Sequence, residues 1–338
     1  MNRSRLDQIR RLGLWVVLAL VTGAFALASP TFRTPYNLLN ILEQNAIIGI
    51  VACGMTVMMI AGGFDLSVGA IGATASVVGA NIALIGGGDV VAIAAGLGVG
   101  LVIGLVNGLL ISRVKINAFV TTFAMASIVS GLLFVATTAR SAVGSTPLIK
   151  AAATAKLGPV PVVFLIFIAF IALVWFILTR TRYGHYVYSV GGNAEASLLS
   201  GVPVERVQTL AFGFGGLLAA AGGLLLLGQT DVGQPSAATS WPLEAIAICV
   251  VGGVALTGGV GRIVDVLAAT LLLGVIGNGL NQVGVSPYWQ PAVTGLVILG
   301  AVILDQLNRS RRSSRRSPEK KKLVGDVTES VVTVTPTR

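Results

Sequence analysis

The sequence predicts an all-α, polytopic membrane protein with about ten transmembrane helices. Three bulk properties carry this prediction: 54% of the 338 residues are hydrophobic, only 11% are charged, and the mean hydropathy is +0.88. Soluble domains carry roughly 25% charged residues, so this chain lies far from that class. The 43 glycines agree with a membrane bundle, because small residues let membrane helices approach closely.

Ten apolar segments reach or approach the length of about 20 residues that a helix needs to cross a bilayer. They cover residues 12–29, 45–62, 66–86, 89–111, 117–138, 160–179, 208–228, 242–259, 263–283 and 287–304. The first segment has a second interpretation, because its basic flank and its Ala26-Leu27-Ala28 end are typical of a cleaved secretory signal. We expect it to remain as a span, since a polytopic chain can insert without such a signal.

The distribution of basic residues predicts that both termini lie in the cytoplasm. With the N-terminus inside, only four of the 23 Lys and Arg residues fall outside, namely Arg33, Arg140, Lys150 and Lys156. This asymmetry follows the positive-inside rule, so the net charge of +10 does not indicate nucleic-acid binding. We divide the chain into a transmembrane domain, residues 1–305, and a basic, serine-rich cytoplasmic tail, residues 306–338, which we expect to be disordered.

A short internal echo predicts a repeat. Residues 104–110 read GLVNGLL and residues 275–281 read VIGNGLN, so Asn107 aligns with Asn278 at an offset of 171 residues. The same offset places the second to fifth predicted spans on the seventh to tenth. When the chain is followed through the membrane from a cytoplasmic N-terminus, the two spans of each pair cross in opposite directions. This pattern indicates an inverted-topology repeat, which in transporters frames a substrate path.

The sequence has little material for catalysis or metal binding. Its two cysteines lie inside apolar runs, no zinc-type Cys/His spacing occurs, and His185 is the only histidine. The glycine-rich residues 252–262 lack the Gly-Lys-Ser/Thr of a nucleotide-binding loop, since no lysine in the chain follows a glycine. We therefore expect no catalytic residue, no metal, no cofactor and no ATP hydrolysis by the chain itself.

An aspartate stands between the second and third predicted spans, in the stretch AGGFDLSVGA at residues 61–70. Gly62 and Gly63 supply a tight turn, and Asp65 at a helix N-cap can accept hydrogen bonds from the backbone N–H groups of Ser67 or Val68. Two alternatives stay open. One is an ion or proton site, since intramembrane acids are often functional, and the other is contact with a cytoplasmic partner.

The segment 180–207 is the most polar stretch between spans. Counting the predicted spans from a cytoplasmic N-terminus places it in the cytoplasm. Gly191 and Gly192 predict a turn, Asn193 predicts a helix cap, and Gly201 ends a short helix that starts near Glu195. Such a surface helix can dock on a partner, and an ordinary linker is the alternative.

Four stretches resemble the membrane permease subunits of bacterial ABC importers for ribose, xylose, galactose and related sugars. They are GGFDLSVG at 62–69, NGLLISRVKINAFVTT at 107–122, GGNAEASLLSGV at 191–202 and NGLNQVGVSPYWQPAVTGLVIL at 278–299. With the spans between them, the resemblance covers about residues 38–305. It implies a multi-pass subunit in the inner membrane bilayer. The implied partners are a second copy of itself, two cytoplasmic ATP-binding subunits and an external sugar-binding protein.

The resemblance also implies roles for individual residues. In such importers a cytoplasmic EAAxxxG-like element forms the coupling helix that docks on the ATPase. Three residues match this element and three match its lead-in: Glu195, Ala196 and Gly201, then Gly191, Gly192 and Asn193. Ser197 departs from the second alanine of the pattern. The family's GG-x-D-LS motif is matched by Gly62, Gly63, Asp65 and Ser67. This match does not distinguish a helix-capping role of Asp65 from a role in coupling.

We therefore predict the permease subunit of an ATP-driven importer, which forms the translocation path for a monosaccharide or a related small polar solute. Sparse amides suit a weakly binding path, and helix packing is the equal alternative for the four candidates: Asn107, Asn278, Asn281 and Gln282. An ion-coupled secondary transporter is the first rival, although it should carry buried mid-span acids. A non-transporting membrane assembly subunit is the second rival.

Overall fold

The computed structural model describes residues 3–289 together with residues 292, 295–296 and 299–300. The chain divides into two units, residues 1–294 and 295–338, and the account below concerns the first. Of the tenth predicted span, 287–304, the described part includes the short 3-10 helix η1 (Pro287–Trp289). The boundary predicted at residue 305 and the tail that follows it lie outside the described residues.

Six helices in the described part of the chain are long and apolar enough to cross a membrane. They are α2 (Pro35–Ile60), α4 (Asp89–Ser112), α5 (Ala118–Thr137), α7 (Val162–Arg180), α10 (Val204–Thr230) and α12 (Ile263–Gln282). Three shorter apolar helical segments accompany them: residues 13–28 of α1 (Arg3–Ala28), α3 (Val68–Leu84) and α11 (Trp241–Val251). Each predicted span between residues 12 and 283 overlaps one of these helices, although α2 begins ten residues before the predicted residue 45. An all-α membrane bundle is confirmed.

The eighth predicted span is shorter than expected. We predicted residues 242–259, but α11 ends at Val251 because Gly252 and Gly253 follow it, and Gly253 has a φ of +75°. Gly258, Gly259 and Gly261 also have positive φ, a conformation that residues with a side chain rarely adopt. The glycine-rich stretch 252–262 is therefore a turn, although residues 252–259 had been included in the predicted span.

Several connections that we treated as loops contain regular structure. Near one end of the bundle lie α6 (Pro147–Thr154) and two antiparallel strand pairs, β1 (Ala142–Val143) with β4 (Val232–Gly233) and β2 (Lys156–Leu157) with β3 (Val160–Pro161). Proline at the first position of α6 suits a helix start, because the missing N–H has no partner there in any helix. Near the other end lies α8 (Arg182–Gly192), which we had not predicted. It is followed by α9 (Ala194–Leu199), the short helix that we predicted to start near Glu195.

The core of the bundle forms around α10, which packs against α2, α3 and α4. Small residues at every fourth position of α4 face α10, among them Gly100 and Gly104. A Cβ atom at either glycine would come within 2.4 Å of a backbone oxygen of α10, so only glycine permits this approach. The apolar stretches of α2 and α10 are each 72% buried, whereas that of α5 is 17% buried and faces outward.

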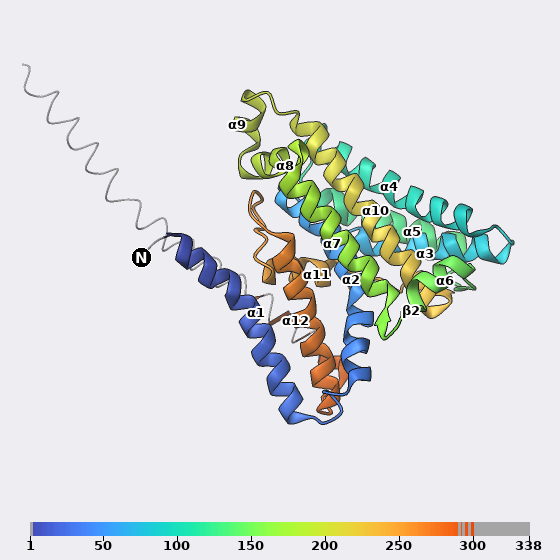
Figure 1. The fold of residues 1–338 in the computed structure, drawn as a ribbon. Coiled ribbons are helices and arrows are strands. Elements are labelled where there is room, and N and C mark those ends of the chain that lie inside the picture. The colour runs from blue at the N-terminus through green and yellow to red at the C-terminus, as the bar shows by residue number, and fades with distance from the viewer. Residues whose placement is uncertain (1–2, 290–291, 293–294, 297–298, 301–338) are drawn as a thin grey trace, which may run out of the picture. The chain divides into compact units, whose positions relative to one another are not determined.

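The two ends of the bundle carry different elements (Figure 1). At the end where α2 finishes, α8 and α9 extend beyond α7 and α10, and we call this the α9 end. At the opposite end of α10, α6 packs against α10, α7 and α4, and we call this the α6 end.

Candidate functional site

Three connections meet in direct backbone contact at the α9 end. The N–H of Gly259 donates a hydrogen bond of 2.9 Å to the carbonyl oxygen of Ile60, the last residue of α2. Gly191 lies against the same carbonyl, because a Cβ atom there would be 1.7 Å from the oxygen of Ile60 and 2.6 Å from the nitrogen of Gly259. The end of α8, the end of α2 and the turn before α12 are thus packed without intervening side chains.

Two tyrosines fix α8 to the bundle. The hydroxyl of Tyr183 donates to the carbonyl oxygen of Val207 in α10 at 3.1 Å, and that of Tyr188 donates to the carbonyl oxygen of Gly261 at 2.8 Å. Burial raises the pKa of both tyrosines above the ordinary value, and for Tyr188 the charge of Arg262 lowers it in part. Both hydroxyls therefore stay protonated as donors, and these two bonds join α8 to α10 and to the 252–262 turn.

The short helix α9 has a defined start and end. The side-chain oxygen of Asn193 accepts from the N–H of Ala196 at 2.9 Å, which is the expected cap. Gly201, with a φ of +82°, ends the helix: its N–H donates to the carbonyl oxygen of Leu198 at 2.9 Å, and the N–H of Val202 donates to that of Ser197 at 3.0 Å. This pair of bonds is the Schellman motif that a glycine at this position permits.

The turn that we predicted at Gly191 and Gly192 is wrong. Both residues belong to α8, which runs on to Gly192 before Asn193 starts α9. Ser197, the residue that departs from the resembled pattern, is buried, and its hydroxyl is 3.0 Å from that of Ser189 in α8. The departure therefore adds a polar link between the two helices.

The outer surface of α9 is apolar. Leu198 is 62% exposed and Leu199 is 85% exposed, and Glu195 is exposed in the first turn of the same helix. Large exposed apolar side chains on an otherwise polar segment indicate an interaction surface. The α8–α9 pair thus offers a contact surface on a rigid base.

Asp65 lies at the α9 end but is completely buried. Its Oδ1 accepts from the N–H and from the Oγ of Ser67, both at 2.6 Å, and its Oδ2 accepts from the Nδ2 of Asn107 at 3.1 Å. The N-cap position of α3 belongs to Ser67 rather than to Asp65, so the carboxylate supports the start of the helix from two residues before it. Gly62, with a φ of +97°, and Gly63 form the turn that leads to it.

The environment of Asp65 disfavours the charged form of its carboxyl group. Burial raises the pKa of its carboxyl, and the hydrogen bonds from Ser67 and Asn107 lower that pKa only in part. Among the residues that the structure describes, no basic side chain forms an ion pair with it. The Oδ1 of Asn107 is also buried and has no hydrogen-bond partner within the same residues.

We expect Asp65→Asn to keep at least about half of the wild-type amount of folded protein and of its transport rate, since asparagine supports helix starts as well as aspartate does. The new amide oxygen keeps the bonds from Ser67, and a rotation of the Asn107 amide lets its unpartnered oxygen accept from the new NH₂ group. Asp65→Leu should instead fail to fold, because each buried group left unpaired costs about 1–3 kcal/mol. Gel filtration in detergent measures folding. Loss of transport by a well-folded Asp65→Asn would indicate a role for the charge.

The four amides proposed for a solute path fall into two groups. Asn107 is completely buried and bonds to Asp65 and Ser67. Near the C-terminal end of α12, Asn278 exchanges two hydrogen bonds with Asn37 of α2, at 2.8 and 3.0 Å, and Gln282 donates to the same Asn37 at 3.0 Å. Asn107, Asn278 and Gln282 therefore join helices, as the packing alternative expects. Asn281 is exposed and also takes part in an interaction.

The bundle of apolar helices, with α8 and α9 extending from one end, defines a multi-pass integral membrane protein. Within the described ranges, no three His, Cys, Asp or Glu side chains gather into a group that could hold a metal ion. Residues 37–302 match the family model described as the branched-chain amino acid transport system permease component. No solved structure matches the chain significantly.

Curated relatives match along most of their length. The chain is 41% identical over 299 residues to the ribose import permease protein RbsC of Bacillus subtilis strain 168, covering 87% of this chain and 91% of the relative. It is 38% identical over 306 residues to RbsC of Escherichia coli K12, covering 89% of this chain and 94% of the relative. It is 35% identical over 300 residues to the L-arabinose transport system permease protein AraH of the same strain, covering 89% and 92%.

The chain belongs to this family of permease components. It is a multi-pass membrane transport subunit rather than an enzyme.

Proposed function

We propose that the chain is the membrane-spanning subunit of an ATP-driven importer and forms the translocation path for a monosaccharide. The relatives named for ribose and arabinose import support this substrate class, because they match nearly their whole length. The observation that carries the mechanism is the exposed helix α9 on a base that contacts the ends of three membrane helices. The proposed partners are a second copy of the chain, two cytoplasmic ATP-binding subunits and an external sugar-binding protein.

The distribution of charge supports a cytoplasmic location for the α9 end and for both termini. Six basic residues lie in or beside the connections at this end: Arg113, Lys115, Arg180, Arg182, Arg206 and Arg262. Four lie in connections on the opposite side of the bundle: Arg33, Arg140, Lys150 and Lys156. The excess of basic residues at the α9 end follows the positive-inside rule for an inner membrane protein.

The packing of the helices supports the inverted repeat. Shifted by 171 residues, α2 falls on residues 206–231, α3 on 239–255 and α4 on 260–283, close to the bounds of α10, α11 and α12. Contacts are reciprocal as well, since α10 packs against α3 and α4 while α2 packs against α11 and α12. Such exchanged pairs are expected when two halves of opposite orientation interlock. The tenth span would then complete the second half.

The contacts at the α9 end suggest how force reaches the path. Closure of the ATP-binding subunits would displace α9, and α8 would carry the movement through Gly191 to the end of α2 and to the 252–262 turn. The helix α2 ends at this point and α12 begins after the 252–262 turn. The two halves of the repeat would therefore tilt against each other and open the path to alternate sides of the membrane. Asn107, Asn278 and Gln282 would hold helices together during this movement, which leaves Asn281 as the candidate to contact solute.

Uptake by reconstituted protein tests the proposal. Liposomes that contain the chain, its ATP-binding partner and internal ATP should accumulate radiolabelled ribose or L-arabinose only when the binding protein is present outside. A protonophore should leave this uptake unchanged, whereas omission of ATP should abolish it. Uptake driven by a proton or sodium gradient without ATP would establish the ion-coupled rival. Undiminished sugar uptake in cells that lack the chain would favour an assembly subunit.

A further inference from the structure

An apolar groove lies under α6, away from the α9 end. Its walls come from α4, α6, α7 and α10, which contribute for example Leu97, Ile149, Phe170 and Leu224, and its volume is about 160 Å³. All of its lining residues are aliphatic or aromatic. Leu97, Phe170 and Ala221 are only half-buried, so the groove opens at the surface of the bundle.

The lining excludes a sugar as the occupant. Polar groups that enter an apolar site lose their hydrogen bonds to water and gain none, which costs several kcal/mol. Apolar cavities of about 150 Å³ stay free of water and accept apolar ligands. Since α4, α7 and α10 are membrane-spanning helices, the apolar groups available at the mouth of the groove are lipid acyl chains.

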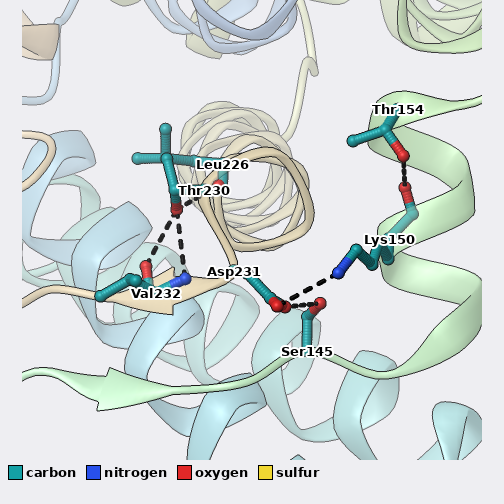
Figure 2. A network of polar contacts seen from close by, with 7 residues as sticks. All are labelled: Ser145, Lys150, Thr154, Leu226, Thr230, Asp231 and Val232. Atoms are coloured by element: carbon teal, nitrogen blue, oxygen red, sulfur yellow. Dashed lines mark hydrogen bonds and ion pairs between the residues drawn. The ribbon is translucent and has the colours of Figure 1, made fainter.

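The helix over the groove is held in place by polar contacts at both of its neighbours. The N–H of Leu148 donates to the Oδ1 of Asp89, the first residue of α4, at 2.7 Å. Figure 2 shows that Lys150 of α6 and the hydroxyl of Ser145 converge on Asp231, which follows the end of α10. The hydrogen bonds from Ser145 and Lys150 hold the pKa of Asp231 below its usual range, which favours the ionised carboxylate that binds Lys150 and so holds α6 over the groove.

A cation stands on the same helix as the apolar lining. The Nζ of Lys150 is 3.1 Å from the Oδ2 of Asp231, and the side chain of Lys150 is 55% exposed. An ammonium group has three N–H donors, so donors remain for a phosphate after the bond to Asp231. Lys150 follows Ile149, a lining residue, which places a charge beside an apolar groove as a phospholipid requires.

We propose that this groove binds one phospholipid, with an acyl chain between α4, α7 and α10 under α6 and the phosphate at Lys150. The bound lipid fixes α6, and with it the β1–β4 pair that joins the segment after α5 to the segment after α10. The site depends on the membrane location of the bundle and not on the transported solute.

Native mass spectrometry of the purified transporter complex tests this site, with phosphatidylglycerol added back after delipidation. Wild type should retain one phospholipid per copy of the chain. Ala221→Phe, which fills the groove from α10, should weaken binding at least about tenfold, because the displacement of two buried methylene groups suffices for that change. Ala94→Phe on the exposed face of α4 is the matched control and should bind as wild type does.

A second pair of variants tests the position of the phosphate. Lys150→Gln should weaken phosphatidylglycerol binding, whereas Asp231→Asn breaks the same ion pair but keeps the cation and should bind at least as well as wild type. Equal weakening by both would show that only the fixed position of α6 matters and would overturn the headgroup assignment.

A measurement on the wild-type protein covers the case in which Ala221→Phe does not fold. Phospholipid with a photoreactive group in its acyl chain, in nanodiscs, should label residues 93–97, 148–152, 166–170 and 221–225 above all other membrane segments. Even labelling of all lipid-facing helices, or equal lipid retention by Ala221→Phe and Ala94→Phe, would show only the ordinary lipid belt and would overturn the proposal. Retention of detergent in place of phospholipid by wild type would do the same.

Discussion

Gly191→Ala is expected to reduce ATP-dependent uptake about 5- to 140-fold per folded transporter, because overpacking costs about 1–3 kcal/mol and each 1.4 kcal/mol is a factor of ten. The added Cβ would lie 1.7 Å from the oxygen of Ile60 and 2.6 Å from the nitrogen of Gly259. Both are backbone atoms that cannot rotate away, so α8 has to move off the end of α2. The contact that transmits the movement of α9 is then broken.

Gly192→Ala is the matched control for this prediction. Nothing lies within 4 Å of a Cβ atom built at Gly192, and this residue also belongs to α8. Alanine is favoured over glycine in a helix by roughly 0.5–1 kcal/mol, so this variant should transport as wild type does. Uptake into proteoliposomes, divided by the amount of folded chain, gives the comparison. Equal rates for the two variants would refute transmission through this contact.

The long membrane helices could be predicted from the sequence because about 20 apolar residues in a row have few other solutions. The bounds of α4 and α12 differ from the prediction by at most one residue at each end. The failures lie where glycine has two meanings. Gly252 and Gly253 end α11 as glycines in a turn do. Gly191 and Gly192 instead continue α8, and at Gly191 the packing against the end of α2 requires a residue without a side chain.

The second failure, at α8, left a signal that could have found it. Tyr183, Val187 and Val190 are spaced as residues i, i+4 and i+7, and Val187 and Val190 are buried. This is the pattern of one face of an amphipathic helix. Glycines and charges within 180–207 favoured a loop, and the pattern was outweighed by them.

The candidate site combines residues that a single sequence cannot bring together. Asp65 and Asn107 were assigned to different roles, a cap and a path, yet their side chains are 3.1 Å apart. The contact arises because α4 returns along α3, so that its end lies beside the turn before α3. Likewise, Gly191, Ile60 and Gly259 are in contact although they belong to three connections that are far apart in the chain. Only tertiary packing brings these residues together.

Leu199→Asp is expected to abolish the association of the chain with its ATP-binding subunit while membrane insertion stays normal. At 85% exposure Leu199 makes almost no contact within the chain, so the fold does not depend on it. A hot-spot side chain at the centre of an interface contributes at least about 2 kcal/mol, which corresponds to a loss of affinity of roughly 30-fold or more. Co-purification through a tag on the ATP-binding subunit measures the association.

Leu157→Asp is the matched control, because Leu157 is also 70% exposed but lies in β2, toward the α6 end. It should leave the association unchanged. Two further variants alter the same surface of α9 by different means. Glu195→Arg reverses an exposed charge near the helix start, and Gly201→Trp adds bulk where a φ of +82° disfavours any side chain. Both should also lose the ATP-binding subunit. Normal co-purification of that subunit with all three α9 variants would mean that it docks elsewhere, and α9 would then have no part in coupling.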